Sequence, residues 1–396
     1  MAEGYLPYGC HDVDEEDIAA VVNVLRHGVL TGGPKISEFE KSFANKVMAK
    51  EAVVVSNGTA ALHLALLAAG ISAGDTVIVP SVTFLSSANA VLMTGADVHF
   101  ADVCPETGLM TPKTLRQALS TAKAPVKCVL PVHLTGQMCD MVSIKQIAEQ
   151  HTLKIVTDCC HALGASYAEG GHPGDGGYED FGCFSLHPVK SIAMGEGGVI
   201  TTSSSASAER MRLLRGHDMH RTPESFLHSE AAFDKKGAVN PWYYEMHELA
   251  YNYRATDMQC ALGISQLTKL DAFIERRQAL ATIYDALLSG SNGITPNQRT
   301  PWSNSAWHLY AVSIDFKALG VGRGDVMREL LDQNIGSQVH YIPVHEQPFY
   351  KQRYGAQKLP GAQAYYEKTL SLPLFPAMTN DDPQRVITAL QKVLNL

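Results

Sequence analysis

Lys190 stands in an unusual stretch, "FSLHPVKSIAMGEGG" (residues 184–198), between a strand-like run and a group of glycines. Its neighbours Val189, Ile192 and Met194 are apolar, and Pro188 restricts the backbone just before it. An amine held among apolar groups loses its charge more readily and becomes a nucleophile. Because most lysines are simply exposed loop residues, this interpretation depends on the rest of the chain.

A turn that suits a phosphate is predicted by "SNGTAALHLAL" (residues 56–66), which is typical of a strand, a glycine turn and a helix start. The backbone N–H groups of Gly58, Thr59 and Ala60 would lie at the positive end of that helix. The lysine spacing of a P-loop and the GxGxxG pattern of a dinucleotide site are both missing. We therefore expect a single bound phosphate, with an ordinary strand–helix turn as the alternative.

Asp158 ends the strand-like run "KIVTD", at the edge where open α/β sheets bind ligands. It could cap the next helix or pair with a cationic ligand group. Lys190 follows 32 residues later (190 − 158). Phosphate turn, strand-end carboxylate and lysine, in this order, meet the needs of pyridoxal 5'-phosphate (PLP): the turn anchors its phosphate, the carboxylate keeps its ring nitrogen protonated and the lysine binds its aldehyde covalently.

The surrounding helices and strands must position these residues. From residue 52 to about 160 the chain alternates short apolar runs with helical patterns. This alternation predicts an α/β fold with a mostly parallel sheet covered by helices. Asp12 is expected to cap an N-terminal helix, and residues 257–290 read as one long amphipathic helix. Residues 215–245 show neither the apolar periodicity of a helix nor that of a strand and are expected to form a long functional loop.

Two domains are expected from the length of 396 residues. Residues 1–270 would form an N-terminal arm and a large PLP-binding α/β domain. Residues 271–396 would form a smaller C-terminal α+β domain.

The net charge of −8, without a basic cluster, argues against nucleic acid or an anionic membrane as partner. Eight cysteines without a CxxC pair favour a reducing compartment. The acidic N-terminus lacks an apolar signal core, and no apolar run reaches membrane-spanning length. A cytoplasmic protein is therefore expected.

The chain resembles the DegT-type (DegT/DnrJ/StrS) sugar aminotransferases, PLP-dependent enzymes of fold type I that act on nucleotide-linked keto-sugars. The resemblance covers nearly the whole chain through "LTGGPKISEFEKSFA", "VSNGTAALHLAL", "DCCHALGASY", "FSLHPVKSIAMGEGGVI" and "SLPLFPAMT". "GHDMHR", "WYYEMHELAYNYRATDMQCALG" and "YIPVHEQPFY" are similar to the branch that makes the 4-amino sugar precursor of pseudaminic acid. This implies amino transfer to C4 of a UDP-linked 4-keto-6-deoxy-N-acetylhexosamine, with L-glutamate as donor and 2-oxoglutarate as its product, in a homodimer with shared active sites.

The resemblance also implies roles for individual residues. Lys190 would bind PLP covalently, and Asp158 would pair with the ring nitrogen. Phe84 would lie against the ring. Asn252 would reach the phosphate bound by the neighbouring subunit. The full set of expected cofactor contacts is Gly58, Thr59, Phe84, Asp158, His161, Ser185, Lys190 and Asn252, and the expected substrate contacts are Thr31, His187, His217, Arg254, His308 and His345.

Some roles stay open. His187 could be catalytic or could buttress its loop, and Arg254 could pair with the donor carboxylate or the diphosphate, or, as the structural role that we favour, stabilise the dimer. No metal is expected, because neither His217 with His220 nor His340 with His345 has a carboxylate or cysteine at the usual ligand spacing.

Three rival functions are weighed. A related sugar dehydratase would carry histidine in place of Lys190. A non-catalytic PLP-binding regulator would not need both Lys190 and Asp158. The third rival is an aminotransferase for another nucleotide-linked 4-keto-6-deoxy sugar, of perosamine or bacillosamine type.

Overall fold

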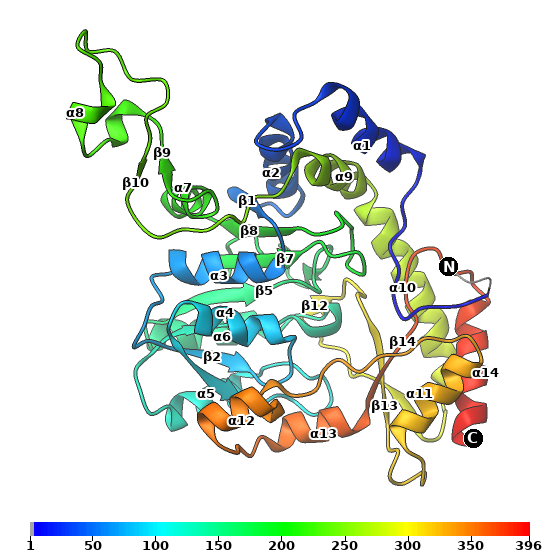
Figure 1. Cartoon of the computed structure of the whole chain (residues 1–396). Helices are drawn as coiled ribbons and strands as arrows, with labels where there is room; N and C mark the ends of the chain where they lie inside the picture. Colours follow the sequence, from blue (N-terminus) through cyan, green and yellow to red (C-terminus); the bar gives the residue numbers. More distant parts are fainter. Residues whose placement is uncertain (1–3) are drawn as a thin grey trace.

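The computed structural model describes residues 4–396; residues 1–3, the start of the predicted N-terminal arm, lie outside the described residues. Its centre is a seven-stranded sheet (Figure 1). Strand β8 is antiparallel to both of its neighbours, and the other pairs are parallel, so the sheet is mixed and mostly parallel as predicted. The strands lie in the order β1 (Glu51–Val55), β8 (Gly198–Thr202), β7 (Phe181–Ser185), β5 (Lys154–Asp158), β4 (Val126–Val129), β2 (Thr76–Pro80) and β3 (Asp97–Ala101).

Helices cover both faces of this sheet, which explains why its strands read as continuous apolar runs. Val77 and Val79 of β2 pack in one cluster with helix α3, whereas Ile78 packs in a second cluster with α5 and α6. The helices around the sheet are α2 (Pro34–Lys46), α3 (Gly58–Ala68), α4 (Leu85–Met93), α5 (Pro112–Thr121), α6 (Met141–Gln150) and α7 (Ser205–Leu214).

A separate apolar cluster surrounds a three-stranded antiparallel sheet, β11 (Ile294–Pro296), β13 (Tyr310–Ile314) and β14 (Thr369–Leu372). Leu6 from the N-terminal segment belongs to this cluster, and its N–H donates to the carbonyl of Asn334 at 2.9 Å. Tyr350 and Tyr365 instead join the clusters of the large sheet. The division at residue 270 stays a prediction. The helices of this cluster are α10 (Leu270–Leu288), α11 (Arg323–Asp332) and α14 (Asp382–Leu394), whereas α12 (Pro348–Tyr354) and α13 (Pro360–Lys368) pack in the clusters of the large sheet.

Two helix predictions were wrong in detail. Helix α1 (Glu15–His27) is capped by Asp14, not Asp12, and the Asp14 carboxylate accepts the N–H groups of Glu16 and Asp17. The long helix expected over 257–290 is two helices, α9 (Asp257–Thr268) and α10, that meet at Lys269. The Lys269 amine forms an ion pair with Asp17 at 2.9 Å, so this break is held against α1.

Residues 217–250, the projecting hairpin from here on, extend away from the body beyond α7 (Figure 1). They contain a short ribbon of β9 (Met219–His220) and β10 (Glu245–Met246), the 3₁₀ turn η2 (Pro223–Ser225) and helix α8 (Ser229–Ala232). Trp242 and Leu249 are 74% and 81% exposed on it. Over the described residues, no helix has the length and hydropathy needed to cross a membrane. The remaining short elements are β6 (Ser166–Tyr167), β12 (Ser303–Asn304), η1 (Leu134–Gly136) and η3 (Val344–Glu346).

Candidate active site

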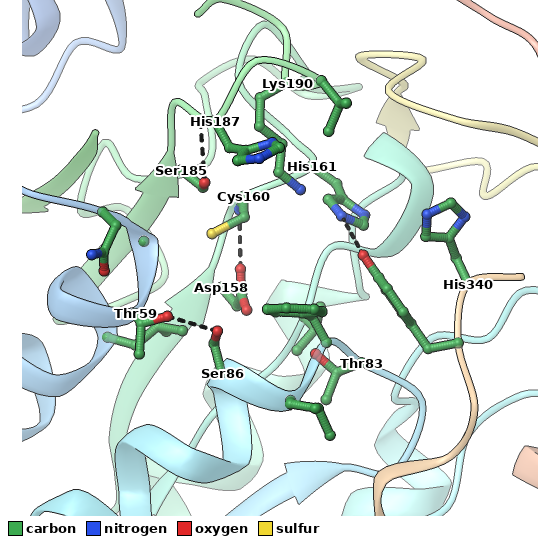
Figure 2. Close-up of a pocket in the computed structure, with 18 of the residues that line it drawn as sticks. Thr59, Thr83, Ser86, Asp158, Cys160, His161, Ser185, His187, Lys190 and His340 are labelled. Atoms are coloured by element: carbon green, nitrogen blue, oxygen red, sulfur yellow. Dashed lines mark hydrogen bonds between the residues drawn. The ribbon is translucent and has the colours of Figure 1, made fainter. Parts of the chain in front are cut away.

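A cavity of about 720 Å³ lies where β5 and β7 end and α3 begins (Figure 2). This is the carboxyl edge of the parallel strands, where open α/β sheets bind ligands. Residues that the sequence predicted as a site and that line the cavity are Gly58, Thr59, Phe84, Asp158, His161, Ser185, His187 and Lys190.

Asp158 is the last residue of β5 and is only 5% exposed. One of its carboxylate oxygens accepts a hydrogen bond from Ser87 Oγ at 2.8 Å, and the other accepts the N–H of Cys160 at 3.1 Å. In the part of the chain that the structure describes, no lysine or arginine pairs with this carboxylate. A buried carboxylate needs a compensating positive charge, so Asp158 is suited to a cationic group of a ligand in the cavity.

Lys190 lies in the loop between β7 and β8, and its side chain points into the cavity (Figure 2). The loop is closed by backbone hydrogen bonds from Lys190 to His187 (2.8 Å) and from Leu186 to Gly197 (2.8 Å). Burial lowers the pKa of the Lys190 amine, although the charges of Cys160 and Asp158 oppose the shift. The amine is therefore poised to react as a nucleophile.

A glycine is required where this loop enters β8. A side chain at Gly198 would place its Cβ 2.3 Å from the carbonyl oxygen of Asn57 and 2.9 Å from the nitrogen of Gly58. The Lys190 loop and the start of α3 are thus in direct contact.

The start of α3 offers a place for an anion. The Asn57 side chain accepts the N–H of Ala60 at 2.9 Å, and the first N–H groups of a helix have no partner within it. A Cβ at Gly58 would lie 2.9 Å from Ser185 Cβ, so only glycine fits there. The Thr59 and Ser86 hydroxyls are hydrogen-bonded at 2.7 Å. Backbone N–H groups and hydroxyls at a helix N-terminus suit a phosphate.

Phe84 precedes α4 and is 55% exposed although it lines the cavity. Its ring centroid lies 5.9 Å from that of Tyr341. An aromatic face left open beside a cavity is suited to stacking against a flat ligand ring.

His161 is buried, and burial lowers its pKa well below the usual value. Its Nδ1 accepts the N–H of Thr135 at 3.3 Å, so the neutral ring carries its proton on Nε2. That nitrogen lies 3.2 Å from the hydroxyl of Tyr341 and donates to it. His308 lies against this ring with centroids 4.2 Å apart, and burial lowers its pKa as well.

Other predicted residues do not line the cavity of the same chain. Thr31, His217, Asn252 and Arg254 are exposed outside it. His345 is buried, and its Nδ1 lies 2.5 Å from Ser81 Oγ. His308 contacts Lys190 without being part of the cavity lining.

Sequence reasoning missed Ser87 and Tyr341. Ser87 lies in a serine-rich segment after β2, at the same carboxyl edge as Asp158, and this position was a usable signal. Tyr341 carries no such signal, because only the tertiary fold brings it to His161.

A reactive amine, a buried carboxylate, an anion site and an open aromatic face around one cavity fit PLP, and together with the fold they define a PLP-dependent aminotransferase. The chain belongs to the DegT/DnrJ/EryC1/StrS aminotransferase family, whose model matches residues 11–391. The enzymes of this family are PLP-dependent sugar aminotransferases.

Individual relatives match this chain over nearly their full length. The spore coat polysaccharide biosynthesis protein SpsC of Bacillus subtilis is 39% identical over 394 residues, which are 98% of this chain and 97% of SpsC. The structure is similar to Helicobacter pylori PseC, an aminotransferase involved in the biosynthesis of pseudaminic acid, with a TM-score of 0.88, 25% identity and 99% coverage of both chains. It is also similar to the PLP form of Spr1654 from Streptococcus pneumoniae, with a TM-score of 0.87, 27% identity and 99% coverage of both chains.

Proposed function

We propose that the protein transfers an amino group from L-glutamate to C4 of a UDP-linked 4-keto-6-deoxy-N-acetylhexosamine, in the biosynthesis of a pseudaminic acid-type sugar. The observation that carries the proposal is the convergence of the Lys190 amine, the Asp158 carboxylate and the start of α3 on one cavity. The likeness to PseC supports the choice of sugar. The proposal includes a cytoplasmic location and the two domains expected from the sequence.

The residues of the cavity would divide the binding of PLP among them. Lys190 would hold the aldehyde carbon, and Asp158 would accept a hydrogen bond from the protonated ring nitrogen. Phe84 would lie against the ring, with His161 near it. The phosphate would be bound by Gly58, Thr59 and Ser185, which meet at the start of α3.

Lys190 would have a second task. When bound, PLP carries the amino group and takes up the electron pair that remains when a proton leaves the donor carbon. The Lys190 Nζ, made more available as a base by burial, would take that proton from the donor α-carbon and deliver it to the cofactor carbon that Lys190 had held before. Asp158 would keep the ring nitrogen charged throughout.

The remaining predicted contacts other than His187 lie outside this cavity and are proposed to act in a homodimer with shared sites. Asn252 would be supplied by the second chain to the phosphate. His187 lines the cavity. It is proposed to contact the sugar nucleotide, and Thr31, His217, Arg254, His308 and His345 are proposed to do so either directly or through neighbours.

A substrate panel tests the function. Purified enzyme is incubated with glutamate and UDP-, GDP- or dTDP-linked 4-keto-6-deoxy sugars, and the amino sugars are measured by mass spectrometry. We expect the UDP-linked N-acetylhexosamine to give the highest kcat/KM. Lys190→Ala is expected to be inactive, whereas Lys113→Ala, an exposed lysine on α5, serves as the matched control.

Other outcomes would redirect the assignment. A higher kcat/KM with a GDP- or dTDP-linked sugar would favour an aminotransferase of perosamine or another type. Release of water from the sugar without amino transfer would contradict the aminotransferase itself.

A further inference from the structure

Two triplets of the same pattern face each other in the projecting hairpin: Asp218-Met219-His220 and Glu245-Met246-His247. β9 and β10 are antiparallel, with Glu245 opposite His220 and Met246 opposite Met219. Directly opposed residues project their side chains from the same face of a ribbon. His220 and Glu245 therefore share a face, and Asp218 and His247 flank them.

The contacts confirm that these four side chains gather. Asp218 Oδ1 lies 3.1 Å from His220 Nε2, and Glu245 Oε2 lies 2.9 Å from His247 Nε2. The two imidazole rings are stacked with centroids 4.0 Å apart. Asp218, His220 and His247 each offer one ligand atom, and these three atoms lie within 4.8 Å of one another.

The two carboxylates of this cluster are buried without a lysine or arginine paired to them in residues 4–396. Asp218 and Glu245 are 3% and 8% exposed. Across residues 4–396, their ion-pair partners are the histidines, and the Tyr243 hydroxyl also donates to Glu245 Oε1 at 2.8 Å. Histidines are neutral when they ligate a metal, so the two carboxylates would then leave a charge of −2 that a divalent cation offsets.

The backbone holds both carboxylates in place. Asp218 Oδ2 accepts the N–H groups of His247 and Glu248, each at 2.9 Å. Glu245 accepts the N–H groups of Leu227 at 2.7 Å and His228 at 2.9 Å. The acidic side chains are thus fixed in the hairpin before any ion binds.

We propose that Asp218, His220 and His247 bind a divalent transition-metal ion, with Zn²⁺ as the best match and Glu245 as the partner that orients His247. Bonds of about 2.0–2.2 Å in a tetrahedral site place two ligands about 3.4 Å apart. Asp218 and His220 are already near this spacing, whereas the ligand atom of His247 lies within 4.8 Å and must move by up to about 1.4 Å, with its ring turning out of its stacking on His220.

The ligand types decide the class of ion. Imidazole nitrogens suit Zn²⁺ and its neighbours, whereas Mg²⁺ and Ca²⁺ prefer oxygen ligands alone. A carboxylate that holds the other nitrogen of a ligating histidine is the usual outer partner in such sites. The ion would tie together the two ends of residues 221–244, which lie outside the active-site cavity. The sequence-based expectation of no metal paired His220 with His217, whereas the ribbon pairs His220 with Asp218 and His247.

Zn²⁺ titration tests this site. Tag-free enzyme with PLP bound is treated with a chelator, dialysed and titrated with Zn²⁺ against a coloured zinc indicator, with stoichiometry checked by native mass spectrometry. We expect one Zn²⁺ per chain, not displaced by millimolar Mg²⁺. His220→Gln and His247→Gln should each weaken binding at least tenfold, and His228→Gln, an exposed histidine of the same hairpin, should bind like wild type.

A second measurement covers variants that fold poorly. Zn²⁺ should slow proteolysis within residues 221–244 of the wild-type chain, and this protection should be lost in His247→Gln with PLP absorbance retained. Failure of wild-type enzyme to bind Zn²⁺ would overturn the proposal. Equal affinity in the His220→Gln, His247→Gln and His228→Gln variants would overturn it as well, since the cluster would then be a hydrogen-bonded clamp only.

Discussion

The side-chain amine of Lys190 lies 3.5 Å from Nε2 of His308, a buried histidine whose Nδ1 has no hydrogen-bond partner in residues 4–396. The pKa of His308 is lowered well below its usual value, chiefly by burial and further by the nearby Lys190 amine. A neutral imidazole in this place can accept a hydrogen bond from the amine. His308 thus contacts the Lys190 amine without itself lining the cavity.

Replacing His308 should slow catalysis more than it weakens binding. His308→Asn shortens the side chain and removes the acceptor for Lys190, and a hydrogen bond to a charged group contributes about 1.5 kcal/mol or more. We expect kcat to fall about tenfold with KM nearly unchanged, in steady-state kinetics with the best sugar of the panel. His99→Asn, a half-buried histidine on β3, is the control. A rise in KM with kcat preserved would place His308 at the substrate instead.

Asp158→Asn should have a larger effect. The ring nitrogen of PLP would lose its charged partner at a buried position, at a cost on the order of 3–5 kcal/mol, which corresponds to roughly 150- to 5,000-fold in kcat. Ser87→Ala removes one hydrogen bond to the same carboxylate and should cost about tenfold. If Asp158→Asn stays within tenfold of wild type, Asp158 is a structural residue.

The parts of the fold that could be predicted are those with a local signal. Val77, Ile78 and Val79 are buried on alternating faces, and such continuous apolar runs in a sequence indicate a parallel sheet. The break at Lys269 could not be predicted, because the pattern of apolar residues continues through it and the ion pair with Asp17 is a tertiary contact.

The same distinction applies to the site. Lys190, Asp158 and Gly58 lie beside strand ends and a glycine turn, where position in the chain already restricts their role. Tyr341 comes from the far C-terminal part of the chain, and no local pattern points to it. The metal cluster depends on the register of two short strands, which sequence spacing does not specify.

The pH dependence of cofactor attachment tests the environment of Lys190. Only the neutral amine reacts with an aldehyde, so the rate of PLP attachment to apoprotein should rise with pH and level off above the pKa of Lys190. Because burial lowers this pKa, the rate of PLP attachment should level off at a lower pH than the rate at which exposed lysines are chemically labelled. Asp158→Asn removes a charge that raises the pKa and should move the profile to still lower pH. Stopped-flow absorbance measures the rate, and a shift to higher pH would contradict this account.

Glu179 makes the stability of the fold pH-dependent. Its Oε1 accepts the N–H groups of Gly174 (2.9 Å) and Gly176 (3.1 Å), its Oε2 has no partner within the described chain, and burial raises its pKa to about 7. A raised carboxyl pKa means that the folded state binds the proton more tightly, so stability falls as pH rises from about 4.5 to 7.

Glu179→Gln keeps the acceptor oxygen and carries no charge, so it should escape this loss. Between pH 5 and pH 8, the free energy of unfolding of the variant should rise relative to that of wild type by up to about 3 kcal/mol. Scanning fluorimetry would show this as a Tm difference of a few °C. A Tm difference that is the same at both pH values would show that Glu179 does not titrate in this range.

Active sites shared between two chains would be revealed by mixing variants. Asn252 is exposed and outside the cavity of its own chain, and we propose that it reaches the phosphate of the partner's site. Lys190→Ala and Asn252→Ala chains, each poorly active alone, should regain activity when refolded together, because one site of each mixed dimer then contains both residues. Random pairing predicts about a quarter of wild-type activity. Mixing Lys190→Ala with Asp158→Asn is the matched control, since both residues line the cavity of one chain and no site would be complete. If heterodimers form and the first mixture stays inactive, Asn252 acts within its own chain, for example as a structural residue beside Gly216, to which its backbone is paired.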